Sequence, residues 1–82
     1  MPLANETVSM LRLTPNRSKI IHMDKDVASV KVNDPSLLFV LVNGSRQFNV
    51  LAKDKKGFAF YTAYDKQGRV VEERYVLGGT RG

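Results

Sequence analysis

The chain contains no cysteine and no long apolar run. Without cysteine, neither a disulfide framework nor a thiolate metal site can form. The longest apolar run covers residues 37–42, far short of the roughly 20 residues that a membrane-spanning helix needs. Residues 1–6 lack a basic start followed by an apolar stretch, so we expect no signal peptide within this chain.

The chain also lacks a helical period, an internal repeat and a low-complexity segment. Apolar residues make up 43% and charged residues 26% of the sequence, the balance of an ordinary globular domain rather than a disordered or membrane segment. With 82 residues there is room for one domain. A domain this small buries only roughly 60% of its unfolded surface, which leaves a thin core and little space for a buried active site.

Positive charge is in excess, with 13 Lys and Arg against 8 Asp and Glu and a net charge of +5. Such an excess could favour nucleic acid, anionic lipid or an acidic partner, and it does not select among them. The only basic cluster is residues 53–56, immediately before Gly57. We interpret this cluster as a solvated hairpin loop.

A spaced series of turn residues is the clearest feature of the sequence. Glycine reaches positive φ, proline presets φ, and Asn and Asp bond their own backbone, so each cluster ends a strand for a physical reason. Structural turns are predicted at Asp34, Pro35, Asn43, Gly44, Gly57, Asp65 and Gly68.

Apolar and β-branched segments lie between these turns. We predict strands at residues 7–13, 17–23, 27–32, 37–42, 47–52, 58–64 and 69–77, with one short helical turn near 34–38. The Asn43-Gly44 signal predicts an antiparallel hairpin between the fourth and fifth strands. The expected fold is a small all-β, antiparallel, Ig-like sandwich at residues 7–77, between a disordered segment (1–6) and a flexible tail or linker (78–82).

Two strands have faces that need interpretation. Residues 37–42 are apolar on both sides, as expected of a central strand or of one whose outer face binds a partner. Residues 58–64 carry rings at Phe58, Phe60 and Tyr64 on one face and small residues around Tyr61 on the other. We expect the ring-bearing face to form the core of so small a domain.

Three stretches together with the final turn resemble a known module. They are residues 15–23, 27–35 and 50–57, and the turn is at 65–68. They are similar to the N-terminal domain of pilus-assembly secretins, the outer-membrane channel subunits of tight-adherence type IV pili and of related type II and type III secretion systems. The resemblance covers roughly residues 8–77 and rests on turns and strands rather than on reactive groups.

The resemblance implies a non-catalytic periplasmic domain, part of an outer-membrane complex, that helps a ring-forming channel to assemble and to meet other pilus or secretion components. Oligomers are then expected only in the full-length context. We predict that an exposed edge strand and the apolar segment supply the docking surface, since unpaired backbone groups accept a partner strand. The candidate docking residues are Leu37, Leu38, Phe39, Val40 and Leu41.

Neither an enzyme nor a metal site is indicated. His22 has no Ser, Cys or paired carboxylate at triad spacing, and we expect a structural or surface role for it. Asp24 and Asp26 beside it make a poor cation site. Asp65 and Gly68 match only part of a calcium loop. No catalytic residue, metal ligand or cofactor is therefore predicted.

Two other classes remain open. Exposed rings flanked by Lys and Arg bind single-stranded nucleic acid in some small β-domains, and Phe58, Phe60, Tyr61, Tyr64 and the loop at 53–56 would supply them. An Ig-like interaction module of another exported protein would share the same fold.

Overall fold

The computed structural model describes residues 10–79, which form seven β-strands and no helix. The strands are β1 (Leu11–Leu13), β2 (Ser18–His22), β3 (Ser29–Val32), β4 (Leu38–Val42), β5 (Gln47–Ala52), β6 (Gly57–Tyr64) and β7 (Val70–Gly78). The predicted all-β class is confirmed. Residues 1–6, expected to be disordered, and the start of the first predicted strand lie outside the described part.

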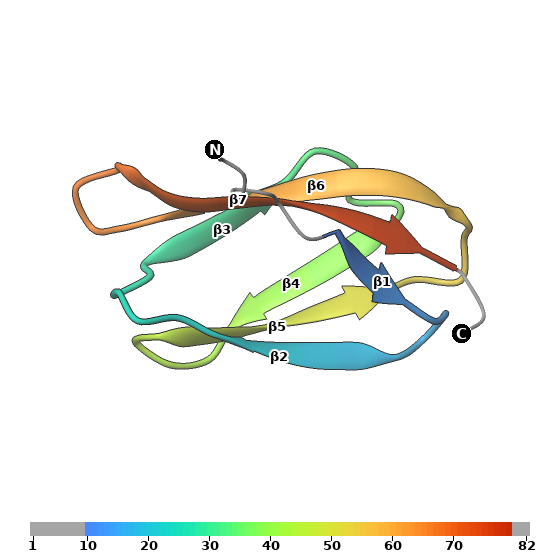
Figure 1. The fold of residues 1–82 in the computed structure, drawn as a ribbon, viewed down its shortest axis with the longest axis horizontal. Helices are drawn as coiled ribbons and strands as arrows, with labels where there is room; N and C mark the ends of the chain where they lie inside the picture. Colours follow the sequence, from blue (N-terminus) through green and yellow to red (C-terminus); the bar gives the residue numbers. More distant parts are fainter. Residues whose placement is uncertain (1–9, 80–82) are drawn as a thin grey trace, which may run out of the picture.

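The strands form two sheets that pack face to face (Figure 1). The four-stranded sheet has the order β1-β7-β6-β3, and the three-stranded sheet has the order β2-β5-β4. β1 pairs with β7 in parallel, and every other pairing is antiparallel. The two-layer sandwich is therefore the arrangement that the strand pattern predicted.

The turn residues act in different ways. Asn16 (φ 61°) follows Pro15 in the turn between β1 and β2, where the Arg17 N–H donates to the Thr14 carbonyl (3.2 Å). Gly68 has φ 80°, as its place at the end of the β6–β7 loop predicted. After Asp34 and Pro35 the chain makes a single turn, in which the Leu37 and Leu38 N–H groups donate to the Asp34 carbonyl.

Two glycines differ from expectation. β4 and β5 form the predicted hairpin, but neither Asn43 nor Gly44 has positive φ, so this is not the tight two-residue turn that Asn-Gly suggests. Gly57 is the first residue of β6 and its φ is not positive either. A Cβ there would lie 2.4 Å from Leu37 Cδ1, so packing space is the reason for this glycine.

The core lies between the sheets. Its largest fully buried side chains are Tyr61, Phe48, Leu38, Val50 and Val76. The Phe48 and Tyr61 rings meet edge to face across the two layers, with centroids 5.3 Å apart. Val27 and Leu37, from the connecting segments, are also buried.

The prediction for the rings of β6 was wrong. The inward face carries Ala59, Tyr61 and Ala63, all buried, whereas Phe58 is half exposed and Phe60 and Tyr64 are only partly covered. The space between the sheets is already filled by Phe48 and its neighbours, so β6 has to present mostly small side chains inward. The ring-bearing face is consequently the outer surface of the four-stranded sheet.

The alternative of a central fourth strand was also wrong, because β4 is an edge strand and β5 lies between β2 and β4. The predicted tail begins within the fold: Gly78 ends β7, and the Gly79 N–H donates to the Leu13 carbonyl (3.0 Å). The rest of that segment, residues 80–82, lies outside the described part.

Candidate functional site

β4 presents apolar side chains on an open edge. It pairs with β5 on one side, and within the described residues no strand pairs with its other side. Phe39 (49% exposed) and Leu41 (51% exposed) point away from the core on this strand. An edge strand offers unpaired backbone groups for pairing with another chain. β4 therefore combines an open backbone with two half-exposed hydrophobic side chains.

The five predicted docking residues divide between the core and the surface. Leu37 and Leu38 are 3% and 1% exposed, so including them in an accessible surface was wrong. The turn after Asp34 directs both inward, where Leu37 covers Gly57 and Gly78. Val40 is half-buried and packs against the core. Phe39 and Leu41 are the predicted residues that can contact a partner.

The exposed apolar surface continues from β4 across the three-stranded sheet. Phe39 is in register with Leu51 of β5, and Leu41 is in register with Asn49, which pairs in turn with Ile20 of β2. Side chains of directly paired residues lie on the same face. We call this surface the three-strand patch; it consists of Ile20, Phe39, Leu41 and Leu51.

Asn49 lies between Leu41 and Ile20 in this patch. Its side-chain oxygen Oδ1 is buried and accepts no hydrogen bond in the structure. An unpaired buried acceptor costs free energy, and native proteins tolerate few of them. Asn49 is thus a polar position that the apolar surroundings leave unsatisfied.

A second apolar surface lies on the outer side of the four-stranded sheet. Phe58 and Tyr75 stack with ring centroids 5.2 Å apart, and Phe60 meets Tyr75 edge to face at 5.9 Å. Leu77 is in register with Phe58, and strand alternation puts Met10 on this face ahead of β1. We call this surface the four-strand patch; it consists of Met10, Phe58, Phe60, Tyr75 and Leu77.

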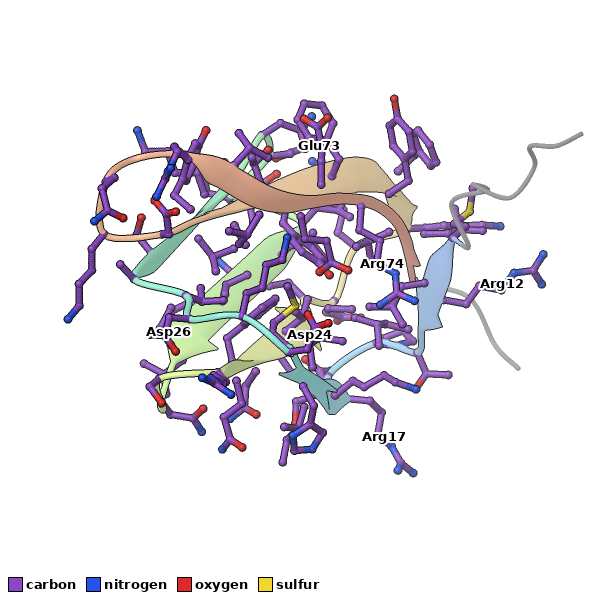
Figure 2. All side chains as sticks on the ribbon, turned by 60° about the vertical axis from the view of Figure 1, so that its left-hand side comes forward. Arg12, Arg17, Asp24, Asp26, Glu73 and Arg74 are labelled. Atoms are coloured by element: carbon purple, nitrogen blue, oxygen red, sulfur yellow. The ribbon has the colours of Figure 1, made fainter. Side chains whose placement is uncertain are left out.

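Most charged residues among residues 10–79 lie in the loops between strands. Figure 2 shows Asp24 and Asp26 in the segment that follows β2, and Glu73 and Arg74 on β7. At one end of the sandwich, Arg46 Nε donates to Asp26 Oδ1 (2.9 Å), and Arg69 Nε donates to Asp65 Oδ2 (3.2 Å). Asp26, Arg46 and Asp65 line an open hollow of about 390 Å³ together with Lys25, Lys66, Gln67 and Val71. Three basic and two acidic side chains therefore face this hollow, and both acids already bond to an arginine.

The residues considered for metal binding have other surroundings. His22 is exposed on the outer face of β2, and Asp24 and Asp26 lie in the following loop. Asp65 Oδ1 accepts hydrogen bonds from the Gln67 and Arg69 N–H groups, both at 2.9 Å. These bonds, with that from Arg69 first, hold the pKa of Asp65 below its usual value. Within residues 10–79, no three possible ligands gather.

Sequence reasoning missed Ile20, Met10 and Tyr75. Alternation along residues 17–23 separates Ile20 from Ile21, but both are apolar, and only Ile21 is buried. Tyr75 joins Phe58 and Phe60 through the β6–β7 pairing. If residues 58–64 are paired with residues 69–77 as a hairpin, Tyr75 comes to lie beside Phe60 and Phe58. The sequence did not indicate, however, that this face of the hairpin points outward.

The basic loop at residues 53–56 is exposed, as predicted, but it is not a hairpin loop, because it connects β5 of one sheet to β6 of the other. Lys55 Nζ donates to the Ser36 hydroxyl (3.1 Å), which ties the loop to the turn before β4. Phe58 and Phe60 face outward near it, whereas Tyr61 is in the core. Three of the four rings weighed for nucleic acid, those of Phe58, Phe60 and Tyr64, therefore reach the surface.

Comparison with known proteins assigns a family. The family model described as the pilus formation protein N-terminal region matches residues 7–77, nearly the whole chain. No curated protein matches the sequence. The family description connects the chain with pilus formation and, through its type II and type III secretion members, with envelope-associated assemblies of several subunits. Within the described residues, no helix is long and apolar enough to cross a membrane.

Proposed function

This chain belongs to the family of pilus formation protein N-terminal regions, and from that premise we propose that it is a non-catalytic docking domain of a secretin-type channel. The domain would lie in the periplasm, as part of an outer-membrane complex, and hold other pilus or secretion components. The observation that carries the proposal is the open edge of β4 with Phe39 and Leu41 half exposed beside it.

The proposed mode of docking is strand addition. A partner segment in an extended conformation pairs with the free backbone groups of β4, and its alternate side chains lie against Phe39 and Leu41. Backbone pairing supplies affinity without a deep pocket, which suits a domain with so thin a core. Sheets in natural proteins protect long apolar edges unless a partner uses them, and β4 carries no charge, proline or bulge that would block pairing.

Amide hydrogen exchange tests this mode. In the isolated chain, those β4 amides that point away from β5 should exchange rapidly, because nothing pairs with them. Adding the remaining domains of the parent protein, or the neighbouring assembly components, should slow exchange at β4 and leave the centre of β5 unchanged. Full protection of residues 38–42 in the isolated chain, with no change after addition, would count against strand addition.

A second candidate is single-stranded nucleic-acid binding, which the outward direction of Phe58, Phe60 and Tyr64 favours. The Phe58 and Tyr75 rings stack on each other, however, so each has one face that no base can reach. Fluorescence anisotropy with labelled single strands distinguishes the candidates. Salt-dependent binding that Lys55→Ala and Lys56→Ala weaken would support this candidate, and absence of binding at low salt would remove it.

A further inference from the structure

The open hollow of about 390 Å³ lies between three loops at one end of the sandwich. The loops are residues 23–28, 43–46 and 65–69, and Figure 1 shows them together on the left-hand side of the molecule. The volume of the hollow falls within the usual range of ligand pockets, about 300–1,000 Å³. None of its lining residues belongs to β4, so the hollow is separate from the docking edge proposed above.

Backbone hydrogen bonds hold the three loops in one arrangement. The Val27 N–H donates to the Ser45 carbonyl (2.8 Å), which joins the first loop to the second. The Ala28 N–H donates to the Tyr64 carbonyl (2.8 Å), immediately before the third loop. The hollow is therefore formed before a ligand enters, which lowers the entropic cost of binding.

The acidic side chains at the hollow are already paired. Arg46 Nε lies 2.9 Å from Asp26 Oδ1. Arg69 Nε lies 3.2 Å from Asp65 Oδ2. A guanidinium has five N–H groups, so Arg46 keeps its Nη1 and Nη2 groups for a second acceptor. Each pair is neutral as a whole, and the two acids therefore do little to repel an anion.

Two lysines supply positive charge that no acid balances. Lys25 lies in the first loop and Lys66 in the third, and both line the hollow with exposed side chains. Within residues 10–79, neither of them forms an ion pair or a hydrogen bond through its ammonium group. Once the two neutral pairs are set aside, an anion in the hollow meets two unbalanced positive charges.

The surroundings favour a carboxylate on a side chain over a phosphate group. Phosphate sites often use the backbone N–H groups of a turn or of a helix end. In the β6–β7 loop, the N–H groups of Gln67, Gly68 and Arg69 already donate to Asp65. Val71 gives the hollow an apolar wall, which can cover the methylene groups of a glutamate side chain.

We propose that this hollow binds acidic side chains of a partner protein segment, with their carboxylates against Lys25, Lys66 and Arg46. The donors come from three separate loops, so the segment would carry at least two Asp or Glu residues close together. The net charge of +5 on the chain attracts such a segment from a distance. Because the hollow and the β4 edge share no residue, this contact does not depend on strand addition.

NMR titration of the isotope-labelled chain tests the proposal. The probe is the blocked peptide acetyl-Gly-Glu-Glu-Gly-amide at up to about 10 mM, because a few exposed ion pairs bind only weakly. Amide signals of Lys25, Arg46 and Lys66 should shift. The shifts should become smaller when NaCl is raised from about 20 mM to about 300 mM, since salt screens exposed charges. The same peptide with Gln in place of Glu should cause no shift at these positions.

Two double variants locate the binding site. Lys25→Gln combined with Lys66→Gln should weaken binding of the Glu peptide about fivefold. Lys53→Gln combined with Lys56→Gln is the matched control, because it lowers the net charge equally in the loop between β5 and β6. The control should bind the peptide as the wild type does. All four lysines are exposed, so both variants should fold, and unchanged amide spectra of the core check this.

A third variant changes the affinity in the opposite direction. Asp26→Asn removes one negative charge from the hollow and leaves the Arg46 guanidinium without its ionic partner. The Glu peptide should then bind about threefold more tightly than it does to the wild type. Asp54→Asn makes the same change in the β5–β6 loop and should leave the affinity unchanged.

Four results would overturn the proposal. The first is a Glu peptide that shifts none of the three amides, and the second is a Gln peptide that shifts them equally. The third is equal weakening by the two lysine pairs, which would indicate general attraction to a basic chain. Inorganic phosphate at the same concentration supplies the fourth: phosphate that binds the hollow more tightly than the Glu peptide would replace the acidic partner segment with a phosphate group.

Discussion

Tyr61 carries a hydroxyl group into the middle of the core. Its side chain is fully buried, and the hydroxyl donates to Glu72 Oε1 (2.7 Å), a carboxylate that remains partly exposed at the side of the sandwich. Burial, followed by the hydrogen bond and charge of Glu72, raises the pKa of Tyr61. The packing of this residue in the core therefore makes the free energy of unfolding depend on pH.

We expect Tyr61→Phe to lower the free energy of unfolding by about 1 kcal/mol at neutral pH, because one hydrogen bond is lost while the ring contact with Phe48 remains. An unfolded tyrosine loses its proton near pH 10, whereas folded Tyr61 keeps it. The unfolded state then binds fewer protons, so wild-type stability should fall as pH rises above about 10.

Urea unfolding between pH 7 and pH 11 measures this effect. Above about pH 10, the free energy of unfolding should fall less in Tyr61→Phe than in the wild type, because the variant has no hydroxyl group at this position to lose a proton. Tyr75→Phe changes an outward-facing ring and is the matched control, with little expected change at neutral pH. An equal decline in wild type and Tyr61→Phe above pH 10 would show that the buried hydroxyl does not hold its proton.

Asp65 stabilises the β6–β7 loop through its carboxylate. Asp65→Ala should lower the unfolding midpoint, because the Gln67 and Arg69 N–H groups lose their common acceptor. Asp65→Asn keeps an acceptor oxygen and should cost less. The lowered pKa of Asp65 means that its charged form stabilises the fold above about pH 3.9, and that this contribution disappears as pH falls through the folded value.

Unfolding midpoints measured between pH 2 and pH 7 test the role of Asp65. The acid-side loss of stability should be smaller in Asp65→Asn than in the wild type, and unchanged in Asp54→Asn, which alters another exposed carboxylate in a loop. If Asp65→Asn and wild type lose stability in parallel, the carboxylate is not the titrating group.

At the level of the element, two glycines differ in what surrounds them. Gly68 and Gly79 both have positive φ, but a Cβ on Gly68 meets open space, whereas one on Gly79 would lie 2.5 Å from the Lys56 Cα. Gly68→Ala should therefore cost about 1 kcal/mol from backbone strain alone. Gly79→Ala adds a clash with backbone and should cost clearly more.

Gly44→Ala completes this series as the control. Gly44 has no positive φ, and its close neighbour is the flexible side chain of Gln47, which can move. Its substitution should change stability least. Denaturant unfolding of the three variants gives the order directly, and a Gly79→Ala variant as stable as Gly44→Ala would contradict the account of the β7 terminus.

The strands were predictable from sequence because turn residues separate them. Residues 47–52 were predicted with the bounds that the structure has, and the others differ by one or two residues where they can be compared. The direction of a face was not predictable where both faces are apolar or aromatic. Which face of β6 points inward depends on how Phe48 and Tyr61 fill the space between the two sheets. This is a contact between segments that are distant in the sequence.

The order of strands follows from pairings across long separations in sequence. β1 pairs with β7 and β3 with β6, so no local pattern places β4 at an edge or β5 at a centre. The sequence accordingly identified residues 37–41 as the candidate docking segment, but it did not show which of these residues are accessible. Leu37 and Leu38 look the same as Phe39 and Leu41 in sequence, and only the turn after Asp34 and the layer packing separate them.

For the molecule as a whole, the account predicts that assembly depends on β4. The measurement is the amount of assembled complex recovered from cells that produce the parent protein with Phe39→Asp and Leu41→Asp together, compared with Val70→Asp. Both variants place charge at half-exposed positions, so both should fold and accumulate normally. We predict that the β4 variant loses assembly severalfold while Val70→Asp does not. Equal assembly in the two, at equal protein levels, would contradict the proposed docking function.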